Sequence, residues 1–122
     1  MKVSHTIKLE TYSCQLTFVV TYDINMVCKD IYKKFKFKSD NDDYSESEGI
    51  VVSYDIGKYF LIIDLQYLSH NTIAHEIYHV VVRVTEERNI VDEEAQAWLD
   101  GHITGAIYKF LDKKKFKIKH GG

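Results

Sequence analysis

Residues 69–82 read SHNTIAHEIYHVVV, and they carry the strongest structural signal in the chain. A helix can begin there, because Ser69 or Asn71 can accept a hydrogen bond from an unpaired backbone N–H of the first turn. The flanking apolar residues, which a helix packed against a sheet requires, are Ile73, Ala74, Ile77, Val80 and Val81. The pattern predicts a helix from about Thr72 to about Glu87.

Two pairs of strands are predicted before this helix. Apolar and polar residues alternate over residues 3–9 and again over residues 16–22, as in half-buried strands. Residues 50–54 and 59–65 are rich in β-branched and aromatic side chains, which favour strands. The Asp-Ile-Gly sequence between them is expected to form a hairpin turn, because glycine accepts a positive φ.

Two further helices are predicted, one between the strand pairs and one near the C-terminus. Asp23 or Asn25 can cap the first, whose apolar residues recur at helical spacing. Asp92 can cap the second, and Glu93 and Glu94 suit the positive end of its dipole. The apolar stripe of this last helix comprises Ala95, Trp98, Leu99, Ile103, Ala106, Ile107, Phe110 and Leu111. The basic tail that follows, DKKKFKIKHGG, is expected to be loose.

The predicted elements follow the order β-β-α-β-β-α-α. This order indicates an α+β fold, with a small, mostly antiparallel sheet of about four strands packed against about three helices on one side. The length of 122 residues is typical of one domain, so residues 1–122 are expected to form a single domain. A hydrophobic content of 45% and an aromatic content of 13% are too high for a disordered chain.

Charge and hydropathy argue against several classes of protein. A formal net charge of −2 argues against a general nucleic-acid binder. No segment approaches the ~20 apolar residues that span a bilayer, and the N-terminus lacks the apolar core of a signal peptide. We therefore expect a cytoplasmic protein with no membrane partner, in which Cys14 and Cys28 are free thiols without a catalytic role.

Residues 75–79 form an HExxH motif. Because residues four apart lie on one face of a helix, His75 and His79 can both direct an imidazole nitrogen at one metal ion, about 2.0–2.1 Å away for zinc. Glu76 lies beside that face and can reach a water molecule on the metal without binding the metal itself. Zinc lowers the pKa of such a water, and the carboxylate takes its proton as it attacks a carbonyl. Zn²⁺ is therefore the expected cofactor, with the two histidines as ligands and Glu76 as the catalytic base.

A third protein ligand is usual for a catalytic zinc. HEIYH followed by EEAQAWLDGHITGAIYKFL resembles the small zinc-peptidase-like proteins of bacteriophages and prophages, and more broadly the minimal gluzincins, including ImmA-like peptidases. The likeness covers about residues 49–111. It implies a minimal zincin-like fold in which Glu94 is the third zinc ligand and Ala95, which follows it, lets the two helices approach closely.

The spacing leaves other third ligands open. Fourteen residues separate His79 from Glu94, fewer than in most gluzincins. A helix that continues to Glu87 carries the chain about 12 Å away from His79. Glu93 is therefore one alternative, and His102 is another, because a third histidine serves in other HExxH proteases.

The helical phase of Glu94 supports it over these alternatives. At 100° per residue, Glu94 shares one face of its helix with Trp98, Gly101 and Gly105. We expect this face to run beneath the motif-bearing helix, because its two glycines allow close contact.

The favoured function is a zinc-dependent hydrolase. The resemblance implies a metallopeptidase of phage or prophage origin that acts on a peptide or protein substrate in the cytoplasm of the bacterial host cell. One strand of the second pair is expected to bind the substrate by backbone hydrogen bonds. Two alternatives remain open: a catalytically inactive zinc-binding interaction module, and a phage accessory protein that targets a host regulator.

Overall fold

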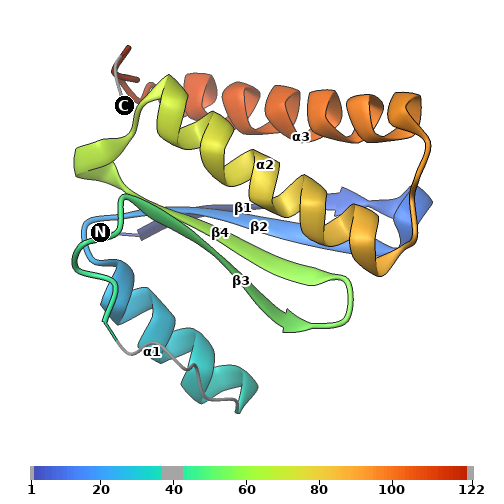
Figure 1. Ribbon diagram of the computed structural model, residues 1–122. Coiled ribbons are helices and arrows are strands. Elements are labelled where there is room, and N and C mark those ends of the chain that lie inside the picture. The colour runs from blue at the N-terminus through green and yellow to red at the C-terminus, as the bar shows by residue number, and fades with distance from the viewer. Residues whose placement is uncertain (1, 37–42, 121–122) are drawn as a thin grey trace.

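The computed structural model describes residues 2–36 and 43–120 (Figure 1). Its elements are β1 (Lys2–Leu9), β2 (Cys14–Thr21), α1 (Ile24–Phe35), β3 (Gly49–Asp55), β4 (Lys58–Asp64), α2 (His70–Glu87) and α3 (Glu93–Lys113). Single turns of 3₁₀ helix, η1 (Glu10–Tyr12) and η2 (Leu65–Tyr67), follow β1 and β4. The predicted α+β fold is confirmed.

The four strands form one open sheet in the order β1-β2-β4-β3. The pairs β1–β2 and β3–β4 are antiparallel, as predicted, whereas the central pair β2–β4 is parallel. The parallel pair follows from the connection, since α1 and β3 separate its two strands in sequence and give the chain room to cross over. β1 and β3 are left as the two edges of the sheet.

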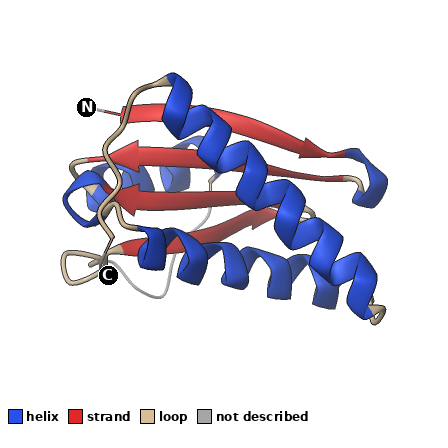
Figure 2. Cartoon of the chain, turned by 90° about the horizontal axis from the view of Figure 1, so that it is seen from above, coloured by secondary structure: helices blue, strands red, loops and turns tan. Residues whose placement is uncertain are grey.

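Helices cover both faces of the sheet, so the prediction that they lie on one side is wrong. Figure 2 shows the two longer helices, α2 and α3, in front of the strands and α1 behind them. The reason lies in β2 and β4, whose apolar residues point to both faces. Phe18 and Leu61 join the core beneath α2 and α3, while Val19 and Ile62 pack with α1 on the other face. A strand that is apolar on both faces requires a layer on each side.

Side-chain caps fix where the helices begin. Ser69 Oγ accepts a hydrogen bond from the Thr72 N–H at 3.0 Å, so α2 begins at His70, two residues before the predicted start. Asp23 and Asp92 cap α1 and α3 in the same way, as the sequence predicted. Each cap satisfies a donor that the helix itself leaves unpaired.

The described part of the C-terminal tail is ordered against the core, so the prediction of a loose tail is wrong. The Lys119 N–H donates to the Leu68 carbonyl at 3.0 Å, and the Lys119 carbonyl accepts from the His70 N–H at 3.0 Å. Phe116 and Ile118 pack against the main core. These two apolar side chains and the two backbone hydrogen bonds hold the segment beside the start of α2.

Candidate metal centre

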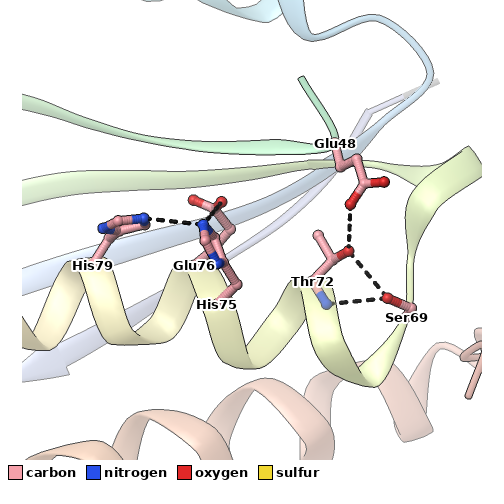
Figure 3. A network of polar contacts seen from close by, with 6 residues as sticks. All are labelled: Glu48, Ser69, Thr72, His75, Glu76 and His79. Carbon is pink, nitrogen blue, oxygen red and sulfur yellow. Dashed lines mark hydrogen bonds and ion pairs between the residues drawn. The ribbon is translucent and has the colours of Figure 1, made fainter. Parts of the chain in front are cut away.

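His75 and His79 lie one turn apart on the exposed face of α2, and their rings point toward each other (Figure 3). Their Nε2 atoms are 3.1 Å apart. Two nitrogens that share a tetrahedral zinc at 2.0–2.1 Å lie roughly 3.3 Å from each other. The pair therefore fits a single zinc ion with little movement of either side chain.

Glu76 is buried beside this pair, with 5% of its surface exposed. Its Oε1 lies 3.8 Å from His75 Nε2. Burial raises the pKa of Glu76, while the charges of His79, His75 and Arg83 act in the opposite direction. A carboxyl group in such surroundings is suited to accept and return a proton.

The three side chains form a compact donor group. One ligand atom from each of His75, Glu76 and His79 lies within 4.8 Å of the other two. Within residues 2–36 and 43–120, no other set of three histidine, cysteine or acidic residues comes this close together. The structure thus brings together the three motif residues that the sequence singled out.

Gly49, at the start of β3, lies close against the buried Glu76 side chain. A Cβ atom at this position would lie 3.0 Å from Glu76 Cγ and 3.2 Å from the carbonyl oxygen of Ile62. Any larger residue here would push the Glu76 side chain or the neighbouring strand away by a few tenths of an ångström, so glycine permits this close contact. The sequence analysis missed this role, although a glycine directly before a strand-like run is a known sign of close approach.

Glu48 is a second residue that the sequence analysis did not single out. Its carboxylate accepts a hydrogen bond from Thr72 Oγ1 at 3.1 Å, and Thr72 Oγ1 in turn lies 3.0 Å from the capping Ser69 Oγ (Figure 3). A pocket of about 190 Å³ opens beside this chain of contacts. It is lined by Glu48, Gly49, Asn71, Thr72, His75 and Glu76.

The structure does not bring Glu94, Glu93 or His102 to the two histidines. The labelled side chains in Figure 3 point away from α3, which runs along the opposite side of α2. Glu93 and Glu94 are exposed in the first turn of α3, and the exposed His102 stacks on Trp98 with ring centroids 5.1 Å apart.

The helical phases explain why Glu94, the predicted third ligand, does not face the two histidines. Nine residues correspond to about 180° of helix rotation. Ile103, which is fully buried, is nine residues from Glu94, so Glu94 faces solvent and not α2. Val84, also fully buried, is nine residues from His75. Each candidate ligand thus sits on the side of its helix that is turned away from the packed interior.

The expected packing of the Gly101 and Gly105 face beneath α2 is wrong for the same reason. A Cβ atom at either glycine would meet nothing within 4 Å. This face of α3 is open, and the contact with α2 and the sheet is made by the buried residues Leu99, Ile103, Ile107, Phe110 and Leu111.

The two cysteines and His70 lie outside the group of His75, Glu76 and His79. Cys14 and Cys28 are buried and unbridged, and burial raises the pKa of the Cys28 thiol to about 11. His70 Nδ1 lies 2.7 Å from the hydroxyl of Tyr108. No helix in the described part of the chain is long and apolar enough to cross a membrane.

Comparison with known proteins adds no relative. No family model matches the sequence, and neither a curated protein nor a solved structure matches it. The argument about function therefore depends on the geometry of the centre.

Proposed function

We propose that the chain is a zinc-dependent hydrolase, most specifically a metallopeptidase, whose metal is held by His75 and His79. The observation that carries the proposal is the 3.1 Å separation of the two Nε2 atoms beside a buried carboxylate. Imidazole nitrogens suit zinc among the divalent metals, although they also accept others. The same spacing within one helical turn is what a shared metal ion requires.

The residues of the chain divide the chemistry between them. Zinc, when bound, supplies a Lewis acid that polarises a carbonyl and makes water a stronger nucleophile. Glu76 accepts the proton of the attacking water and returns it to the leaving amine, for which a raised pKa is suited. The free edge of β3 runs beside the centre and can bind an extended peptide by backbone hydrogen bonds.

A second candidate function is a zinc-binding interaction module without catalysis. It is favoured by the donor set: among the described residues, Glu76 is the only acid grouped with the two histidines. If Glu76 binds the metal as the third ligand, no base remains in the centre. The two functions therefore differ in the role of one carboxylate.

Replacement of Glu76 by glutamine separates the two candidates. For a hydrolase, Glu76→Gln keeps the bound zinc, measured by elemental analysis, while cleavage of a mixed peptide library falls by about 10²–10⁴-fold. Loss of zinc from this variant, with no cleavage by the native protein, would instead support the interaction module. Circular dichroism on both proteins serves as the control for folding.

A further inference from the structure

Arg83 continues the face of α2 that carries the two histidines. It follows His79 by four residues, as His79 follows His75, so the three side chains stand one above another. Its Nη1 donates a hydrogen bond to Ser53 Oγ of β3 at 2.9 Å. The guanidinium is thus held between α2 and the edge strand, one turn beyond the metal centre.

No carboxylate of the described residues lies at ion-pair distance from this guanidinium, although its charge lowers the pKa of Glu76. Within residues 2–36 and 43–120, the one pair of basic and acidic side chains at ion-pair distance is His75 with Glu76. A guanidinium carries five N–H donors, and Arg83 uses one of them on a neutral hydroxyl. Arg88 differs, because its donors are engaged by the carbonyl oxygens of Tyr12 and Ser13 and tie down a turn.

The charged side chains beside the two ends of β3 differ in sign. β3 begins at Gly49 beside Glu76 and reaches Ser53 beside Arg83, a distance of roughly 13 Å along the strand. The carboxylates of Glu48 and Glu76 lie at the first end, and the Arg83 guanidinium lies at the other. A negative group on a bound strand is repelled at the first end and attracted at the second.

We propose that Arg83 is a specificity-determining residue, and that the substrate of this centre carries a carboxylate that Arg83 binds. The inference rests on the proposed hydrolase function and adds a substrate class to it. The planar fork of arginine can bind a carboxylate through two parallel hydrogen bonds. The carboxylate belongs either to the C-terminus of the peptide or to an aspartate or glutamate side chain.

The test uses three peptide hydroxamates that share one zinc-binding group and one leucine residue. They end in alanine amide, in alanine with a free α-carboxylate, or in aspartate amide, so they differ in the presence and source of the negative charge. Their dissociation constants for the zinc-loaded full chain are measured by titration calorimetry. The proteins compared are the native chain, Arg83→Gln, Arg83→Lys and Lys109→Gln, the last of which removes one exposed positive charge from α3.

We expect at least one acidic hydroxamate to bind the native chain about 10- to 100-fold more tightly than the neutral one. Arg83→Gln abolishes this preference, Arg83→Lys keeps part of it, and Lys109→Gln keeps all of it. Tighter binding of the hydroxamate with the free α-carboxylate indicates that Arg83 binds a C-terminal carboxylate. Tighter binding of the hydroxamate that ends in aspartate amide indicates that it binds an acidic side chain.

Two results would overturn the proposal: equal binding of the three compounds by the native chain, or a preference that survives in Arg83→Gln. Either leaves the hydrolase intact, because the neutral hydroxamate still binds through zinc. If none of the three binds the zinc-loaded chain, the proposed function fails together with this inference.

Discussion

α2 and α3 are adjacent long helices, and they differ in whether their polar side chains form a group of potential metal ligands. On α2, His75 and His79 share an exposed strip, and the neighbouring Glu76 is buried against β3. On α3, the acids of the first turn and His102 are exposed, and among the described residues they belong to no group of potential metal ligands. Helical spacing alone brings together metal-binding side chains that lie within one turn of the same helix. A ligand supplied by a second helix also needs the facing sides of both helices to coincide.

The largest expected difference between α2 and α3 is in zinc binding by variants of their histidines and acids. Replacement of His75 or His79 by alanine is expected to reduce zinc from about one ion per chain to nearly none, because each removes one of the two imidazole ligands. Glu94→Ala and His102→Ala are expected to retain the metal, since both residues lie on the outer side of α3. Elemental analysis after dialysis measures all four.

The resemblance to gluzincins predicts the opposite result for Glu94→Ala, namely strong loss of zinc. That outcome would mean that α3 binds the metal in an arrangement different from the one described, and it would contradict the comparison of the two helices. Retention in Glu94→Ala combined with loss in both histidine variants would support it.

The sequence predicted local features well and the relation between the helices poorly. The HExxH spacing, the caps at Ser69 and Asp92 and the hairpin turn depend on residues a few positions apart. The position of Glu94 depends on how far α2 continues and on which side of α3 is buried, and these depend on packing with the sheet. The role of Gly49 also depends on a distant segment, since it is α2 that approaches it.

A second test compares the stability effects of alanine at two glycines, Gly49 of β3, which faces α2, and Gly101 of α3. Gly49→Ala is expected to lower the free energy of unfolding by about 1–3 kcal/mol, because the new Cβ meets Glu76 and a strand carbonyl. Gly101→Ala is the matched control on α3. It is expected to raise the free energy of unfolding by up to about 1 kcal/mol, because alanine favours an exposed helix and nothing lies within 4 Å of its Cβ. Urea denaturation measures both free energies, and a Gly49→Ala variant as stable as the native chain would show that the contact between Gly49 and Glu76 is not tight.

The N-caps provide a smaller contrast. Ser69 is 2% exposed and its hydroxyl is linked through Thr72 to Glu48, whereas the Asp92 cap is exposed. Asp92→Ala is expected to cost about 1 kcal/mol of stability. Ser69→Ala is expected to cost more, because it also leaves a buried hydroxyl with one partner fewer. Thermal unfolding of the two variants measures the difference, and a larger loss in Asp92→Ala would contradict the order.

The smallest expected effect concerns the charge of Glu94 itself. If this carboxylate serves only the dipole of α3, Glu94→Gln lowers stability by about 0.3–1 kcal/mol at low salt, and the difference shrinks as salt screens the exposed charge. Zinc content stays unchanged, because glutamine and glutamate are equally distant from the two histidines. Denaturation at two salt concentrations, with elemental analysis of the same samples, measures both quantities. A dipole effect disappears with salt and leaves the metal in place, whereas a ligand effect persists at high salt and removes it. The second pattern would assign Glu94 to the metal centre and reverse the contrast between α2 and α3.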